Sequence, residues 1–128
     1  MSYYQGRDKK KATGGRLHRS KEKRSFELGS APTETILASK EQINKASRGY
    51  GGNIKTRLTE AAFVNVTDPK TNTTKKVKLL KVKKNPSNVD YERRGVITKG
   101  ALVETELGDA RVTSRPGQDG LLNAILLK

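Results

Sequence analysis

Residues 54–66 read IKTRLTEAAFVNV, and most even positions of this stretch are apolar. The odd positions at its start carry Lys55, Arg57 and Thr59 instead. An alternation with a period of two is typical of a half-buried β-strand, whose successive side chains point to opposite faces. The stretch therefore predicts one strand over 54–66 with a basic outer face at its beginning.

A second strand is expected directly after the first. Residues 68–72 read DPKTN, a strong turn sequence because proline sets φ and Asp or Asn stabilises the bend. Residues 75–84 read KKVKLLKVKK and alternate again, with a slip between Leu79 and Leu80 that indicates a β-bulge. A hairpin over 58–83 follows. Its lysines either present a basic face to phosphates or form a lysine-rich edge that blocks strand-to-strand aggregation.

The remaining chain continues as short elements separated by Gly and Pro. Ser87 with Asp90 three residues later resembles a helix N-cap, and Gly95 is suited to end that helix. We expect a helix over 88–94, strands over 96–99, 101–107, 110–114 and 121–127, a tight turn at Gly108-Asp109 and a loop over 116–120. Short strands at near-regular spacing favour an all-β fold, a small antiparallel β-barrel over 31–128.

The first thirty residues have a different character. Among positions 1–29 there are nine basic and three acidic residues, and apolar residues are almost absent. The basic residues are Arg7, Lys9, Lys10, Lys11, Arg16, Arg19, Lys21, Lys23 and Arg24. Such a segment buries too little apolar surface to offset the entropy of ordering, so we expect a largely irregular N-terminal extension over 1–30 that lies on a polyanion. A localisation signal or a solubility tail is the alternative.

The charge distribution indicates which part of the chain meets that polyanion. The formal net charge is +14 over 128 residues, and residues 30–84 carry twelve basic against four acidic side chains. Residues 85–128 are balanced at six of each sign. A nucleic acid is therefore expected to contact the first two thirds of the chain. Without cysteine, disulfides and thiolate zinc sites are excluded.

No stretch predicts a membrane protein. The N-terminus has no apolar run typical of a signal peptide, and no run approaches the ~18 apolar residues of a membrane span. We expect a cytoplasmic protein without membrane partners.

A glycine-rich stretch is the main candidate site of the folded part. Residues 48–57 read RGYGGNIKTR, with three glycines in four positions. Glycines allow close approach and expose N–H groups to phosphate oxygens, the flanking basic residues supply charge, and the tyrosine is suited to stack on a base. The candidate RNA-binding residues are Arg48, Gly49, Tyr50, Gly51, Gly52, Asn53, Lys55 and Arg57, together with Gly14, Gly15 and the basic residues of the extension. The alternative is a flexible loop whose basic residues are merely solvated.

Other polar residues do not form a reaction centre. The only histidine, His18, lies in the extension, and Glu104 and Glu106 fit an exposed strand face. Arg93 and Arg94 are suited either to contact RNA or to pair with nearby acidic residues. With no nucleophile, base and oxyanion donor together, we expect no enzyme, metal, cofactor or small-molecule substrate.

An ordered set of motifs resembles a known family. It consists of Gln5-Gly6-Arg7, Thr13-Gly14-Gly15-Arg16, Glu27-Leu28-Gly29, Pro32-Thr33-Glu34-Thr35, the glycine-rich stretch and Thr113-Ser114-Arg115-Pro116-Gly117-Gln118-Asp119-Gly120. Together they resemble small-subunit ribosomal protein eight of the archaeal and eukaryotic series, in its short archaeal form. The resemblance implies a β-barrel with a basic extension that binds ribosomal RNA and neighbouring ribosomal proteins. The family more often has Arg or Val at the position of Tyr50, so stacking replaces a charged contact there.

The sequence thus predicts a structural, RNA-binding component of the small ribosomal subunit. A DNA-compacting or chromatin-like protein is the alternative, because the same charge would serve it. A nuclease would need a carboxylate cluster that the acidic residues are poorly placed to form.

Overall fold

The computed structural model describes residues 3–18 and 20–127. Arg19, one of the basic residues expected to bind RNA, lies outside the described residues. The chain divides into two compact units, residues 1–32 and 33–128.

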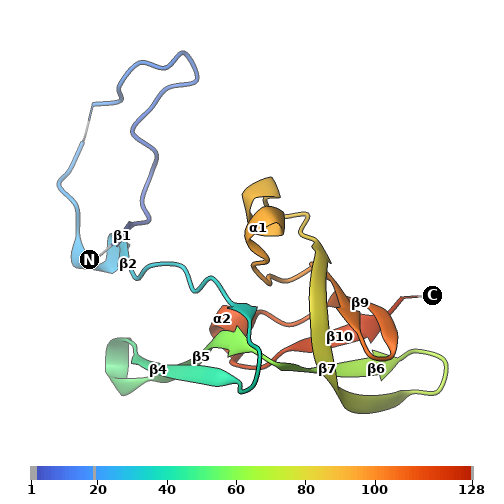
Figure 1. Cartoon of the computed structure of the whole chain (residues 1–128). Coiled ribbons are helices and arrows are strands. Elements are labelled where there is room, and N and C mark those ends of the chain that lie inside the picture. Colours follow the sequence, from blue (N-terminus) through green and yellow to red (C-terminus); the bar gives the residue numbers. More distant parts are fainter. Residues whose placement is uncertain (1–2, 19, 128) are drawn as a thin grey trace. The chain divides into compact units, whose positions relative to one another are not determined.

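The N-terminal unit is a closed loop rather than an open arm. Strand β1 (Tyr3–Tyr4) pairs antiparallel with β2 (Leu28–Gly29), and a 3-10 turn, η1 (Ser25–Glu27), leads into β2. The N–H of Gln5 donates to the carbonyl of Glu27 at 2.8 Å and extends this closure by one residue. The irregular extension expected from composition is therefore closed at its base by the β1–β2 pair (Figure 1).

The second unit is built on a closed five-stranded barrel. Its strands are β6 (Phe63–Asp68), β7 (Thr73–Lys84), β8 (Leu102–Thr105), β9 (Gly108–Val112) and β10 (Asn123–Leu126), in the order β10-β6-β7-β8-β9. Neighbouring strands are antiparallel except β10 and β6, which close the barrel in parallel. The expected all-β barrel is confirmed, with this one parallel pair added (Figure 1).

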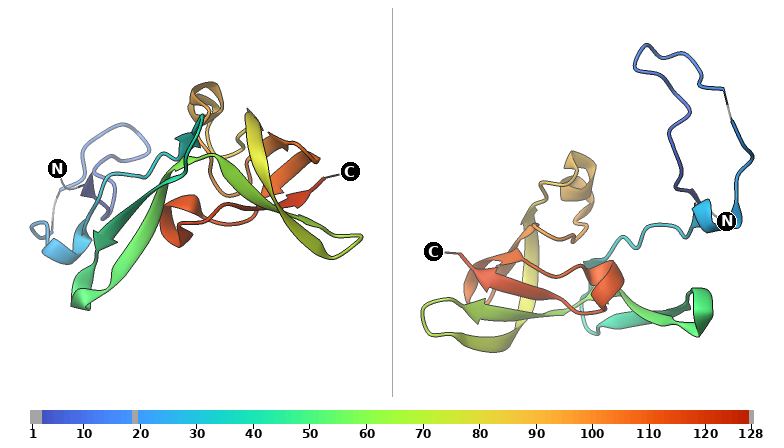
Figure 2. Two further views of the ribbon diagram at one scale, coloured as in Figure 1. Left: turned by 60° about the horizontal axis from the view of Figure 1, so that its bottom comes forward. Right: turned by 180° about the vertical axis from the view of Figure 1, so that it is seen from behind.

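The strand expected over 54–66 is two strands in two different sheets. β5 (Ile54–Ala61) lies between β3 (Ile36–Leu37) and β4 (Ile43–Arg48), whereas β6 begins at Phe63 in the barrel. Ala61 and Ala62 are both buried. Two successive buried residues break the alternation of a single strand, and the chain changes sheet at this point. The β4–β5 hairpin consequently extends away from the barrel (Figure 2).

Strand β7 wraps around the barrel with the bulge that the sequence predicts. Its pairing with β8 shifts register between Leu79 and Lys81 and again between Val82 and Lys84. Residues 73–78 pair with β6, and residues 79–84 pair with β8. Since the whole strand has partners, its lysines do not form a continuous free edge.

The helices and turns differ from the expectation in detail. Helix α1 (Val89–Arg94) ends at Gly95 as expected, but its N-cap is Asn88, whose side chain accepts the N–H of Asp90 at 2.9 Å. The N–H of Ser87 instead donates to Asn85. The loop expected over 116–120 is a one-turn helix, α2 (Pro116–Asp119), because proline suits the first helical position and Gly120 adopts a positive φ of 69°.

Two further local predictions were wrong. Residues 96–99 form no strand; Ile97 only makes an isolated bridge to Thr35. The tight turn lies at 106–107, and Gly108 already belongs to β9. Strand β10 covers residues 123–126 of the apolar C-terminal run, as expected.

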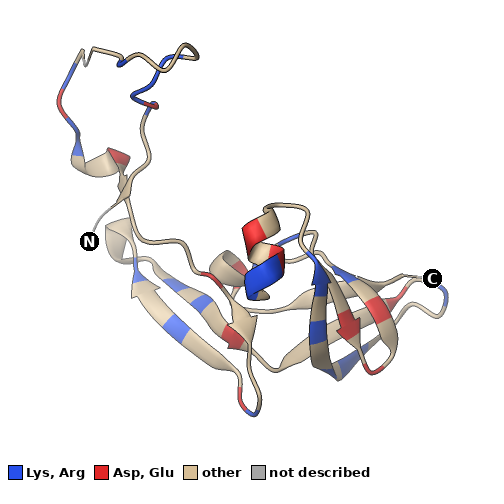
Figure 3. Ribbon diagram, turned by 45° about the horizontal axis from the view of Figure 1, so that its top comes forward, with Lys and Arg blue, Asp and Glu red and all other residues tan. Residues whose placement is uncertain are grey.

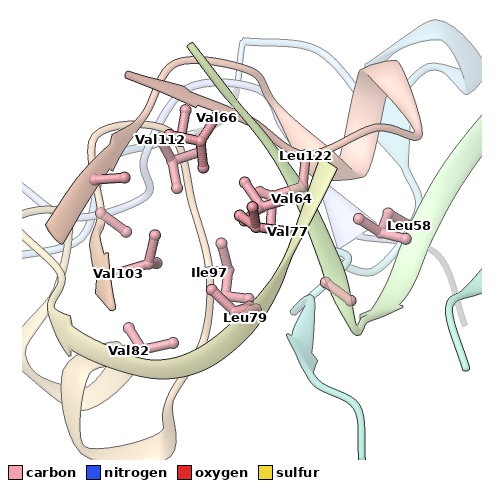
Figure 4. Packing of buried hydrophobic residues seen from close by; sticks show 14 residues of the cluster. Leu58, Val64, Val66, Val77, Leu79, Val82, Ile97, Val103, Val112 and Leu122 are labelled. Carbon is pink, nitrogen blue, oxygen red and sulfur yellow. The ribbon is translucent and has the colours of Figure 1, made fainter. Parts of the chain in front are cut away.

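The core inside the barrel consists mainly of β-branched and small side chains. Val64, Val66, Val103, Val112 and Ile97 are at most 1% exposed and point into the barrel (Figure 4). Leu58 of β5, fully buried, joins the same cluster. The hairpin is thereby anchored at its base while its tip stands in solvent.

Candidate RNA-binding surfaces

The tip of the N-terminal loop is a small basic hairpin. Lys10 and Arg16 face each other in an antiparallel bridge, and the N–H of Lys11 donates to the carbonyl of Gly15 at 2.8 Å. Gly14 takes a φ of 84°, a conformation that side chains disfavour, and its N–H returns to Lys11 at 2.9 Å. Gly14 and Gly15 therefore form the turn of the ribbon that brings basic side chains together.

Some basic residues at the base of this loop contact other side chains of the same loop. Lys21 forms an ion pair with Glu27 at 2.8 Å and lies 5.7 Å from the ring centre of Phe26. Lys23 lies 5.3 Å from the ring centre of Tyr4. The hydrogen bond with Lys21 lowers the pKa of Glu27, assisted by the backbone of Arg24, and the same hydrogen bond raises the pKa of Lys21.

The loop also surrounds a hollow of about 250 Å³. Its lining includes Arg7, Lys9, Lys21 and Lys23 beside Asp8 and Glu27. The remaining basic candidates of this unit within the described residues, Lys10, Lys11, Arg16 and Arg24, are exposed. The loop therefore presents positive charge both at its tip and around its hollow.

The β4–β5 hairpin separates the basic residues that the sequence grouped together. Lys45 lies directly opposite Arg57, and Lys55 is paired with Ser47. Since paired residues share a face and successive residues alternate, Lys45, Lys55 and Arg57 lie on one face of the hairpin. Arg48 pairs with Ile54 and lies on the other face. Lys45 was missed in the sequence because only the strand pairing places it beside Arg57.

The side chain of Arg57 is partly engaged in contacts within the fold. Its Nη1 donates to the hydroxyl of Thr33 at 3.4 Å, and its side chain is half-buried. Its Nε is buried and finds no hydrogen-bond partner in the part of the chain that the structure describes. Lys55, in contrast, is exposed and reaches across to Gln118 of α2, with 3.0 Å between Nζ and Oε1.

The glycine-rich turn is held by its own backbone. The N–H of Gly49 donates to the carbonyl of Asn53 at 2.6 Å, and the side-chain amide of Asn53 donates to the carbonyl of Tyr50 at 2.9 Å. Gly51 and Gly52 have φ of 69° and 78°. Two polar groups expected to meet phosphate therefore shape the turn instead, and they place Tyr50 at its tip, 75% exposed.

Two other groups of basic residues include members that pair with acidic side chains. Arg93 pairs with Asp90 at 2.8 Å, and Arg94 pairs with Asp90 and Glu34, so both are engaged with acidic partners. On β7, Lys83 pairs with Asp109 at 2.6 Å, and this hydrogen bond raises its pKa.

Two other kinds of feature were sought among the described residues. Within residues 3–18 and 20–127, no group of three or more His, Asp or Glu side chains is arranged to hold a metal ion. A helix long and apolar enough to cross a membrane is likewise not found among them.

Comparison with known proteins finds a matching family model and related chains. The family model described as Ribosomal protein S8e matches residues 4–127. Small ribosomal subunit protein eS8 of Sulfolobus acidocaldarius is 54% identical over 128 residues, which cover 100% of this chain and 99% of that protein. The proteins of the same name from Sulfurisphaera tokodaii and Ignicoccus hospitalis are 55% and 51% identical, and the matches cover all of this chain and 99% and 98% of those proteins.

Proposed function

Because this chain belongs to the ribosomal protein S8e family, we propose that it is a structural, non-catalytic component of the small ribosomal subunit in the cytoplasm. Its partners are ribosomal RNA and neighbouring ribosomal proteins. Two basic surfaces carry the RNA contact, the N-terminal loop and the face of the β4–β5 hairpin that bears Lys45, Lys55 and Arg57.

The observation that carries the RNA assignment is the arrangement of that hairpin face. The strand register brings Lys45 and Arg57 together, and Lys55 lies two residues from Arg57 on the same strand. A face of like charges repels itself and gains stability when phosphates replace its counterions. The hairpin is anchored in the barrel by Leu58, so the protein holds the face rigidly before it meets RNA.

The N-terminal loop supports the same role. A two-stranded ribbon closed at Lys10 and Arg16 is narrow, and it carries its charge at the tip. Such a shape is suited to enter a crevice between RNA helices, where phosphates of both sides are within reach. The contacts are made to backbone and shape, which position a protein without reading base sequence.

The test is the salt dependence of binding to small-subunit ribosomal RNA. The double variant Lys45→Ala with Lys55→Ala should reduce affinity and lower the slope of log K against log salt by about 1.4–1.8, the value for two phosphates no longer neutralised. Lys83→Ala is the matched control, because that lysine is already paired with Asp109. An unchanged slope in the double variant would remove the hairpin from the interface.

Two further comparisons complete the experiment. Arg48→Ala reports on the opposite face of the hairpin and should weaken binding less than the double variant. Competition between ribosomal RNA and duplex DNA separates the ribosomal role from DNA compaction, since a DNA-compacting protein would bind both polymers alike.

A further inference from the structure

The outer wall of the barrel carries a second polar surface, formed by β10, β6 and β7. In one row across these strands, Ile125 pairs with Thr67, and Thr67 with Thr74. In the next row Asn123 pairs with Asn65, and Asn65 with Lys76. Phe63 and Lys78 form a third pair. We call this surface the β6–β10 face.

The rows point outward. The residues between them along each strand, such as Val64, Val66 and Ala124, are buried in the core. Asn123, Thr74, Lys76 and Lys78 are exposed, as the alternation requires. The face is therefore an available surface of this unit, made by strands whose register is set by the barrel.

The rows of this face contain basic side chains but no acidic ones. None of the paired residues in these rows is acidic, whereas the β8–β9 wall carries Glu104 and Asp109 beside Lys83 (Figure 3). Lys76 and Lys78 border the face on its β7 side, and hydroxyl and amide groups lie across β6 and β10.

The polar groups are already ordered. Asn65 donates to Asn123 at 3.0 Å, and the hydroxyls of Thr67 and Thr74 are 2.9 Å apart. Lys76 lies 4.7 Å from the ring centre of Phe63. Each amide and hydroxyl keeps further hydrogen-bonding capacity after these contacts, because an amide has two donors and two acceptor sites. A ligand therefore meets fixed groups at low entropic cost.

From this arrangement we propose that the β6–β10 face binds the shallow minor groove of double-stranded RNA. Lys76 and Lys78 neutralise phosphates, and the Asn and Thr side chains beside them hydrogen-bond to 2′-hydroxyls. An A-form helix has a wide, shallow minor groove that displays these hydroxyls. The minor groove of B-form DNA is only about 6 Å wide and excludes a convex barrel wall.

This inference rests on the proposed RNA-binding role and adds a ligand geometry to it. The hairpin and the N-terminal loop supply phosphate contacts that RNA and DNA share. The β6–β10 face supplies the preference for RNA. The ratio of RNA affinity to DNA affinity therefore tests this face separately from overall affinity.

The test uses the full chain with a 16-base-pair RNA duplex of arbitrary sequence and the DNA duplex of the same sequence, with binding followed by fluorescence anisotropy. Asn123→Asp keeps the acceptor for Asn65 but adds a negative charge to the face. It should weaken RNA duplex binding about tenfold and lower the RNA-over-DNA ratio at least about threefold. Asn72→Asp makes the same change in the β6–β7 turn, outside the rows, and should change both quantities less than about twofold.

A lysine pair completes the design. Lys76→Ala with Lys78→Ala should lower the salt slope for RNA by about 1.4–1.8, whereas Lys83→Ala with Lys84→Ala on the same strand should lower it by half that amount or less. If Asn123→Asp fails to fold, as a thermal melt would reveal, Thr74→Asp places the same charge on the β7 side of the face.

Two outcomes would overturn the inference. If Asn123→Asp weakens RNA and DNA equally, the face does not read 2′-hydroxyls. If it behaves like Asn72→Asp, the face does not bind RNA. In either case a reduced salt slope for Lys45→Ala with Lys55→Ala would still support the proposed function, so the two failures are distinguishable.

Discussion

Leu58 is the largest side chain by which the β4–β5 hairpin joins the core cluster of the barrel. It is fully buried in the barrel core, and its backbone carbonyl accepts the hydroxyl of Thr35 at 2.6 Å. Leu58→Ala removes three carbon atoms from this site and leaves a cavity that the barrel walls cannot fill. The substitution should lower the free energy of unfolding by about 2–5 kcal/mol.

The same strand provides a matched control. Ile54 lies four residues earlier on the same face of β5 but is 72% exposed at the hairpin tip. Ile54→Ala should change the free energy of unfolding by less than about 0.5 kcal/mol, since an exposed side chain loses little on truncation. The contrast between the two variants isolates burial from strand propensity.

The measurement is urea or thermal unfolding of the full chain. For a unit of this size each kcal/mol corresponds to a shift of about 4–8 °C in Tm, so Leu58→Ala should lower Tm by about 10 °C or more. Ile54→Ala should leave Tm nearly unchanged. A loss below about 1 kcal/mol for Leu58→Ala would refute the view that this residue anchors the hairpin.

Three further outcomes follow from the packing and the charges. Gly120→Ala should destabilise the second unit by about 1–3 kcal/mol in chemical unfolding, because φ is 69° and a new Cβ would lie 3.0 Å from the carbonyl oxygen of Thr56. Asn85→Ala should cost about 2–4 kcal/mol, since the side chain is 3% exposed and makes three hydrogen bonds to groups that would lose their partner; a near-neutral change would contradict this. The Glu27 carboxyl should titrate below 4.5 in an NMR pH series and return toward 4.5 in Lys21→Met. Because its pKa is lowered in the folded loop, its contribution to loop closure is present above pH 4.5 and is lost as the pH falls through the lowered pKa.

The protein has two kinds of surface, which differ in their balance of basic and acidic side chains. Basic residues gather on the N-terminal loop, one hairpin face and the β6–β10 face. The α1 region and the β8–β9 wall balance their charges in pairs such as Arg93 with Asp90 and Lys83 with Asp109. We expect RNA on the first group of surfaces, and the second group is suited to face proteins or solvent.

The sequence by itself determined the class of fold, the basic extension and the family. These features depend on local information: the period of two in 63–68 and 75–84, the turn at 68–72, the bulge near Leu79 and the ordered motifs. Charge counting likewise needs no coordinates. Even the end of helix α1 at Gly95 follows from the ability of glycine to adopt a positive φ.

Only the tertiary structure decided how the basic residues are grouped. Lys45 stands beside Arg57, and Arg48 is turned to the other face, because the register of β4 on β5 sets which side chains share a face. The break at Ala61-Ala62, the parallel closure of β10 on β6 and the rows of the β6–β10 face likewise depend on strands that are distant in sequence. Alternation reveals that a strand has two faces, but the partner strand determines what each face becomes.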